Sequence, residues 1–219
     1  SGATVGTRLV VASPKAAKLA PEQQSYIRGY VQSFEDALFA DRAANWSTRR
    51  HLDYIDRASW VDFHLLQVLT KNPDGLVRSA YFHKDRGGKI VAGPVWDFDR
   101  AMGSVDPRAD RWDEWSEASE GAPLWETGWW GVLAQDPDFM QAWVDRWQSL
   151  RRTELSDAAL AALVERVAGE VDPDAAARDA ARWIENASRF EGGWRGEVEH
   201  LAAWLARRGD WIDQQFVAP

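Results

Sequence analysis

The sequence predicts an α+β protein that is predominantly helical and carries one small β-hairpin. Apolar residues recur at helical spacing over residues 21–40 and in most segments after residue 128. The segment 79–84 instead alternates and is rich in aromatic residues, and the segment 89–92 follows it after a short turn sequence, which indicates two short paired strands. With 219 residues and 45% hydrophobic content, the chain can bury one sizeable core or two closely packed subdomains.

The composition excludes several classes of function. The chain has 26 Lys and Arg residues against 34 Asp and Glu residues, and this net charge of −8 disfavours nucleic-acid binding, which needs clustered positive charge. No cysteine is present, so disulfides, thiolate catalysis and zinc–cysteine sites are excluded. No apolar run approaches the roughly 18 residues of a transmembrane helix, and we expect no membrane insertion. No signal peptide is visible, and the compartment stays open because the opening Ser-Gly-Ala is typical of a cloning remnant.

The amino-terminal part is predicted to contain a short strand, a helix and a loop. Residues 7–12 have the composition of a strand. Pro21 followed by Glu22 suits the first turn of a helix, because proline is tolerated there and an acid favours the helix dipole. The apolar stripe of this helix continues to about Ala40, and the polar segment 41–57 is predicted to be a loop.

A second helix is predicted from about Trp60 to Lys71. Asp56 or Ser59 can cap its amino end, and Pro73 ends it. This helix is apolar on much of its surface, so we expect it to be buried. It would then give a rigid base to the polar loop that follows.

Three carboxylates flank the predicted hairpin. Asp74 precedes the first strand, and Asp97 and Asp99 follow the second, so a tight hairpin would bring Asp74 close to Asp97. Metal-assisted phosphoryl transfer needs such a set: one carboxylate orients the attacking hydroxyl or accepts its proton, and another holds Mg²⁺ or Mn²⁺ against phosphate oxygens. The alternative is that Asp74 opens a turn and that the other two are solvated or structural. Spacing alone favours this structural interpretation.

The rest of the chain is predicted to be a charged loop followed by helices. Residues 104–123 are rich in charged residues without periodicity, and they either attract a basic peptide or form a solvated loop. We expect helices over 128–134, 138–152, 156–167 and 172–187, and a final helix after Gly192-Gly193.

The aromatic and histidine residues allow two interpretations. Most of the 14 tryptophans fit core packing, including Trp183 in a helical segment, but the group between residues 112 and 130 could instead stack on carbohydrate. His64 and His83 lack a second histidine at metal-ligand spacing, so we assign both a structural role.

An ordered set of motifs in this sequence resembles the spore-coat protein H (CotH) kinase family. The set comprises Tyr54–Leu66, Asn72-Pro-Asp74, Ser79–Asp85, Gly88-Lys89 and Gly93-Pro-Val-Trp-Asp-Phe-Asp99, and the similarity continues through Gly128-Trp129, Asp138-Phe139 and Arg146-Trp147. Members of that family are atypical, often secreted kinases. The resemblance covers most of the chain, and the ordered combination is more specific than any one motif.

The resemblance implies roles for five residues. Asp74 matches the catalytic-loop aspartate, and Asp97 matches the metal-binding aspartate that corresponds to the Asp-Phe-Gly motif of ordinary kinases. Asn72 would shape the loop, and Asp99 and Ser79 would be secondary metal ligands. Ser79 is a departure, because ordinary kinases carry a metal-binding asparagine five residues after the catalytic aspartate, and a serine hydroxyl is a weaker ligand.

The resemblance also implies an architecture. It predicts the large lobe of an atypical kinase, with residues 1–125 forming the catalytic-loop and hairpin core and residues 126–219 forming a helical subdomain of the same domain. The strands and basic residues that grip the nucleotide normally precede this region. Only about twenty residues precede the first helix here, so we expect the nucleotide-binding lobe to be missing from this chain.

The leading functional hypothesis is metal-dependent phosphorylation of a protein Ser or Thr by ATP with Mg²⁺ or Mn²⁺. The protein substrate and a secreted or cell-surface location come from the resemblance alone. The alternative is a non-catalytic scaffold module, either a pseudokinase or a lobe that is inactive without an amino-terminal half. The sequence does not indicate the oligomeric state.

Overall fold

The computed structural model of the chain describes residues 9–104, 106–115, 124–184 and 188–216. Within them it contains helices α1 (Pro21–Ala43), α2 (Arg57–Thr70), α3 (Gly128–Leu133), α4 (Pro137–Arg151), α5 (Asp157–Ala168), α6 (Pro173–Arg182) and α7 (Trp194–Phe216), and strands β1 (Phe82–His83) and β2 (Val91–Ala92). Short 3₁₀ helices cover Ala16–Lys18, Arg50–Asp53 and Pro107–Ala109. The protein is therefore predominantly helical with one small antiparallel sheet, as the sequence predicts.

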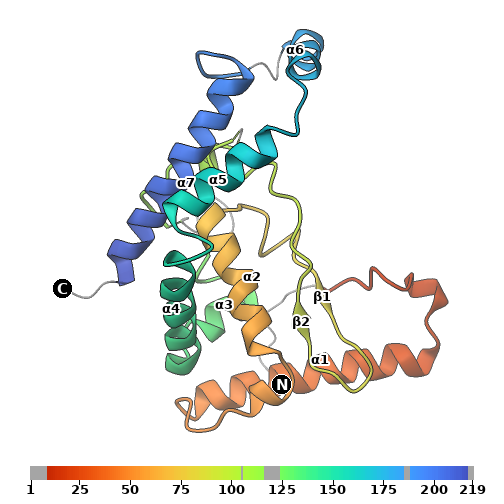
Figure 1. Ribbon diagram of the computed structural model, residues 1–219. Coiled ribbons are helices and arrows are strands. Elements are labelled where there is room, and N and C mark those ends of the chain that lie inside the picture. Colours follow the sequence, from red (N-terminus) through yellow and green to blue (C-terminus); the bar gives the residue numbers. More distant parts are fainter. Residues whose placement is uncertain (1–8, 105, 116–123, 185–187, 217–219) are drawn as a thin grey trace.

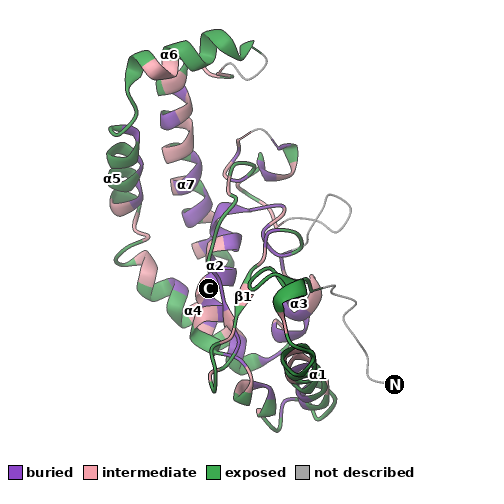
Figure 2. Ribbon diagram, turned by 90° about the vertical axis from the view of Figure 1, so that its right-hand side faces the viewer, coloured by how far each residue is buried: buried purple, intermediate pink, exposed green. Residues whose placement is uncertain are grey.

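Helix α2 is the central element of the fold. Asp56 caps it by accepting a hydrogen bond from the backbone amide of Ser59 at 2.8 Å. Most of its residues are buried, and in Figure 1 it runs through the middle of the molecule beside α4, α7 and the hairpin. In Figure 2 the ribbon of α2 is largely buried, whereas α1, α5 and α6 expose much of their surface. The predicted buried helix at this position is confirmed.

The hairpin is shorter than predicted and is tied to the amino-terminal part of the chain. Phe82 pairs with Ala92 and His83 with Val91. Ile90 forms a parallel bridge with Ile55, and its amide donates to the carbonyl of Tyr54 at 2.8 Å. The predicted loop before α2 thus anchors the second strand of the hairpin.

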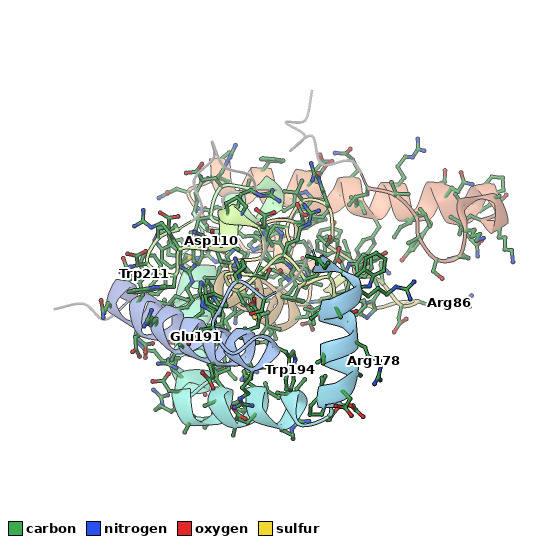
Figure 3. The ribbon with its side chains drawn as sticks, turned by 90° about the horizontal axis from the view of Figure 1, so that it is seen from above. Arg86, Asp110, Arg178, Glu191, Trp194 and Trp211 are labelled. Atoms are coloured by element: carbon green, nitrogen blue, oxygen red, sulfur yellow. The ribbon has the colours of Figure 1, made fainter. Side chains whose placement is uncertain are left out.

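Helices α4, α5, α6 and α7 form the carboxyl-terminal part of the molecule. Asp136, Ser156 and Asp172 cap α4, α5 and α6 with their side chains. Helix α7 packs along α5 and also contacts α2 and α4. Seen from above, α1 and α5 lie on opposite sides of the body, and α6 with Arg178 lies at its edge (Figure 3).

Two predicted elements are wrong in part. Residues 9–12 form no strand, since no neighbouring strand pairs with them in the described residues and Val10 is 81% exposed; residues 7 and 8 lie outside the described part. The helix predicted over 172–187 ends at Arg182, and residues 185–187 also lie outside the description. Trp183, which we assign to the core, is 45% exposed because it follows the end of that helix.

The tryptophan-rich segment belongs largely to the core. Trp129 and Trp130 are each 3% exposed. The half-buried Trp115 packs against Trp211 with ring centroids 4.5 Å apart, and Trp125 packs against Trp143 at 5.1 Å. Rings engaged with each other are not free to stack on a sugar, so the described part of this segment does not support the carbohydrate-binding interpretation. Residues 116–123 lie outside the described part.

Candidate active site

Asn72 connects the loop that follows α2 with the segment that follows the hairpin. Its Nδ2 donates to the backbone carbonyl of Asp97 at 3.1 Å, and its Oδ1 accepts from the backbone amide of Asp74 at 3.2 Å. The chain reaches this position because Lys71, in the left-handed conformation with φ of 48°, ends α2 abruptly. Asn72 is 1% exposed, so the structure places it as a buried bridge between the two predicted aspartates.

Asp74 begins a tight turn and keeps its carboxylate free of hydrogen bonds from the described residues. Its backbone carbonyl accepts from the amides of Val77, Arg78 and Ser79. Its Oδ1 lies 3.6 Å from Nη1 of Arg78 and 3.7 Å from Nη2 of Arg108, which is ion-pair range but too long for a hydrogen bond. The side chain is 19% exposed. This carboxylate can therefore accept a hydrogen bond from a substrate hydroxyl.

Asp97 is held in an unusual conformation. Its φ is +67°, a region that non-glycine residues rarely adopt and that costs of the order of 1–3 kcal/mol. The hydroxyl of Ser79 donates to its Oδ2 at 2.8 Å, while Asn72 holds its backbone carbonyl. Ser79 in turn accepts at its own carbonyl from Nε1 of Trp96 at 3.0 Å. One hydrogen bond thus holds the Asp97 carboxylate and another its backbone carbonyl, while the Trp96 contact holds Ser79 in place.

The oxygens of Asp97 and Ser79 fit a hard divalent cation. Mg²⁺ binds oxygen ligands octahedrally at about 2.1 Å, which sets neighbouring ligands about 3 Å apart. The 2.8 Å separation of Asp97 Oδ2 and Ser79 Oγ matches that spacing. No group of three or more His, Asp or Glu side chains that could hold a metal occurs among the described residues. Mg²⁺ usually binds through one or two carboxylates plus phosphates and water, so this small donor set suits a nucleotide-bound cation.

Asp99 does not join this group. Its backbone carbonyl accepts from the hydroxyl of Ser104 at 2.7 Å, and the residue is exposed. Among the described residues, no hydrogen bond links its carboxylate to Asp97 or Ser79. The structure therefore brings together four of the five predicted site residues: Asn72, Asp74, Ser79 and Asp97.

Sequence reasoning missed the arginines around Asp74. Arg108 forms a two-pronged pair with Asp106, with Nε to Oδ1 at 2.9 Å and Nη2 to Oδ2 at 2.6 Å. Hydrogen bonding to Arg108 lowers the pKa of the Asp106 carboxyl below its ordinary value. The only local signal was Asp106-Pro-Arg108 in the segment that follows the Asp97 motif, where Asp106 caps a 3₁₀ turn.

Helix α7 supports the segment that follows Asp97. The fully buried guanidinium of Arg208 donates to the carbonyls of Val68, Trp112 and Glu114 at 3.0, 2.8 and 2.7 Å. Burial lowers the pKa of Arg208 to about 9, so the group is still charged at neutral pH. It ties the end of α2 to the loop behind the candidate site.

A small pocket lies between this segment and α7. It has a volume of about 200 Å³ and is lined by Phe98, Met102, Ser104, Glu197, His200 and Leu201, among others. Typical small-molecule sites measure roughly 300–1,000 Å³, so this pocket is too small for a nucleotide.

A family model described as CotH kinase protein matches residues 9–212 of the chain. The chain belongs to the CotH kinase family. The match spans the candidate site and every described helix and strand except the last turns of α7, so this family membership confirms the predicted kinase-like fold. No curated protein and no solved structure is significantly similar to this CotH family chain. Among its described residues, no helix is long and apolar enough to cross a membrane.

Proposed function

We propose that this CotH family chain transfers the γ-phosphoryl group of ATP, in a reaction that requires a divalent cation, to a Ser or Thr hydroxyl of a protein. The observation that carries the proposal is the linked set in which Asn72 bridges Asp74 and Asp97 while Ser79 fixes the Asp97 carboxylate. Family membership supports the kinase reaction class. By the resemblance to often secreted kinases, we assign the protein and its acceptor to a secreted or cell-surface setting.

Asp74 orients the acceptor in this proposal. Its carboxylate accepts the hydrogen bond of the acceptor hydroxyl and takes up its proton as the oxygen attacks the γ-phosphorus. The bond between the γ-phosphorus and the β–γ bridging oxygen breaks, and ADP leaves with the electron pair. The absence of competing hydrogen bonds on Asp74 among the described residues leaves its lone pairs available for this role.

Asp97 and Ser79 would hold the cation, and Asn72 keeps both residues close to Asp74. Mg²⁺ or Mn²⁺ bound there would supply positive charge that offsets the charge of the nucleotide phosphates. Because Asp97 is fixed before ligand arrives, little ordering entropy has to be spent when the nucleotide binds. Asp99, two residues after Asp97, stays the proposed secondary ligand of the cation.

A non-catalytic binding module remains the second candidate. It is favoured by Ser79 itself, which stands where ordinary protein kinases carry a metal-binding asparagine and which is the weaker ligand. Such a module would bind a partner without transferring phosphate. Nucleotide binding and phosphoryl transfer must therefore be tested separately.

The test is calorimetric titration of ATP with Mn²⁺ or Mg²⁺ into the wild-type protein and the Asp97→Ala variant. We expect metal-dependent binding that weakens by about a hundredfold in Asp97→Ala, because the principal ligand is lost. The matched control is Asp145→Ala, which removes an exposed carboxylate from α4 and should leave binding unchanged.

A second variant separates binding from chemistry. Asp74→Asn should bind ATP within about twofold of wild type and lose phosphoryl transfer by at least about a hundredfold. Equal binding by wild type and Asp97→Ala would contradict the assigned metal site. Metal-dependent binding without any transfer to a panel of protein acceptors would favour the non-catalytic module.

A further inference from the structure

Three arginines gather around the carboxylates of Asp74 and Asp106 in this acidic protein. Arg78 and Arg108 lie 3.6 and 3.7 Å from its Oδ1. Arg100, which directly follows the Asp97 motif, lies 3.8 Å from the Oδ2 of Asp106. The chain carries a net charge of −8, so this local excess of guanidinium groups runs against its overall charge. Clustered arginine is the usual protein partner of phosphate oxygens.

Arg108 differs from the other two in being held rigidly. Its side chain is 25% exposed, against 73% for Arg78 and 54% for Arg100. Asp106 binds both its Nε and Nη2, and the backbone amide of Arg108 also donates to Asp106 at 3.0 Å. Asp106 is itself 8% exposed and is kept ionised by this pairing. The remaining nitrogen, Nη1, has no partner among the described residues.

The position of Arg108 places its guanidinium at the reaction centre. A hydroxyl that donates to Asp74 lies within about 3 Å of that carboxylate, and the phosphorus it attacks lies about 3 Å further on. Arg108 Nη2 is already 3.7 Å from the same carboxylate oxygen. A phosphoryl group that is in transfer on the side of Asp74 facing Arg108 would therefore lie near the Arg108 guanidinium.

We propose that Arg108, oriented by Asp106, contacts the phosphoryl group during transfer and stabilises the negative charge on its equatorial oxygens. This inference rests on the proposed function. In it Arg108 acts in the manner of an arginine finger supplied by the same chain, and Asp106 is a positioning residue that holds the guanidinium through two hydrogen bonds. The competing explanation is that Arg108 only neutralises Asp74 and holds the loop.

The experiment compares two ligands that differ only at the γ-position. Mg²⁺–ADP probes nucleotide binding, and Mg²⁺–ADP with aluminium fluoride imitates the phosphoryl group in transfer. For Arg108→Gln we expect ADP affinity within about twofold of wild type and a loss of at least about a hundredfold for the fluoride complex. Asp106→Asn should shift the fluoride complex in the same direction by a smaller factor, because Arg108 keeps its charge but loses part of its anchor.

The control is Arg146→Gln. Arg146 forms an equivalent two-pronged pair with Asp62 at 2.7 and 3.2 Å, remote in sequence from the candidate site. This variant should bind both ligands like wild type. Retained ADP binding by Arg108→Gln also shows that the variant is folded.

Three outcomes would count against the proposal. Unchanged affinity of Arg108→Gln for the fluoride complex would overturn it, and so would an equal loss for both ligands, which would assign Arg108 to the diphosphate or to the fold. If wild type binds neither ligand, the proposed function itself fails, an outcome that no Arg108 variant can produce.

Discussion

At the scale of single residues, the candidate site is built before any ligand arrives. Asp97 keeps a positive φ because Asn72 and Ser79 hold its carbonyl and carboxylate from two directions. Backbone strain of this kind persists where the surroundings over-determine a conformation, and it concentrates at functional sites. The Asp74 carboxylate lies in ion-pair range of Arg78 and Arg108. It accepts no hydrogen bond from the described residues. The arrangement fixes the Asp97 carboxylate and leaves that of Asp74 without a hydrogen bond from the described residues.

A substitution at Gly75 tests how closely the loop around Asn72 and Asp74 is packed. A Cβ added at Gly75 would lie 1.9 Å from Oε1 of Gln67 and 3.1 Å from Cγ of Asn72. Gln67 is 1% exposed, so its side chain has little room to move away. Gly75→Ala should therefore displace Asn72, lower the free energy of unfolding by about 1–3 kcal/mol and weaken Mn²⁺–ATP binding by about tenfold.

Urea unfolding and calorimetry measure the two effects of Gly75→Ala. The control is Gly29→Ala in the exposed part of α1, where an added Cβ has no neighbour within 4 Å. That change should raise stability by about 0.5–1 kcal/mol and leave binding unaltered. If Gly75→Ala bound Mn²⁺–ATP as wild type does, the assigned role of Asn72 would be wrong.

At the scale of elements, local signals predicted most of the structure. Proline and capping carboxylates marked the starts of α1, α2 and α6, because these residues satisfy helix ends through contacts within one turn. The strand predicted over 7–12 failed since composition cannot supply the pairing partner that a strand needs. The tryptophans between 112 and 130 could not be assigned from sequence because core packing depends on distant residues such as Trp211.

The same limit applies to the candidate site. The family motifs located Asn72, Asp74, Ser79 and Asp97, which lie in or beside the hairpin and are linked through it. The proximity of Arg108 to Asp74 could not be predicted, because it depends on how the loop after Asp97 folds back toward Asp74. That fold is set by long-range contacts, above all by Arg208 on the last helix. The sequence pattern of a single element does not predict such contacts between distant residues.

Arg208 is predicted to be the main link between α7 and the loop behind the site. Replacing it with Met fills a similar volume but leaves the carbonyls of Val68, Trp112 and Glu114 without this donor. Buried polar groups without partners each cost about 1–3 kcal/mol, so Arg208→Met should lower the free energy of unfolding by about 3 kcal/mol or more. The neighbouring Arg207 is exposed on the same helix, and Arg207→Met should change stability by less than about 0.5 kcal/mol. Urea unfolding of both variants checks this, and equal stabilities would show that the loop is held by other contacts.

At the scale of the whole molecule, one core joins the two halves of the chain. A single hydrophobic cluster contains Phe34 and Trp60 from the amino-terminal half together with Trp143 and Trp204 from the carboxyl-terminal half. Trp129 packs on Phe34 and also donates to the buried carboxylate of Glu35 at 2.7 Å. The helical part therefore shares one core with the part of the chain that carries the candidate site. The division near residue 125 stays a prediction about subdomains within this common core.

His64 links the same two halves and gives the fold a defined pH dependence. Nδ1 accepts from the indole Nε1 of Trp143 at 3.1 Å and Nε2 donates to the carbonyl of Leu124 at 2.7 Å, so the neutral imidazole satisfies both partners. Burial lowers the pKa of His64 from 6.5 to about 4. Between these values the unfolded chain binds the proton and the folded protein does not, so stability falls as pH decreases from 6.5 and levels off below 4.

We therefore expect wild type to lose about 2 kcal/mol of unfolding free energy from this residue between pH 7 and pH 5. His64→Gln lacks the titrating group, so it should be less stable at pH 7 and should lose less stability on acidification. Urea unfolding of both proteins at each pH isolates His64, because His51 and the buried carboxylates are common to the two chains and their contributions cancel. Parallel decreases for the two proteins would contradict the assignment and would move the acid sensitivity to another group, such as the buried Asp41 carboxyl.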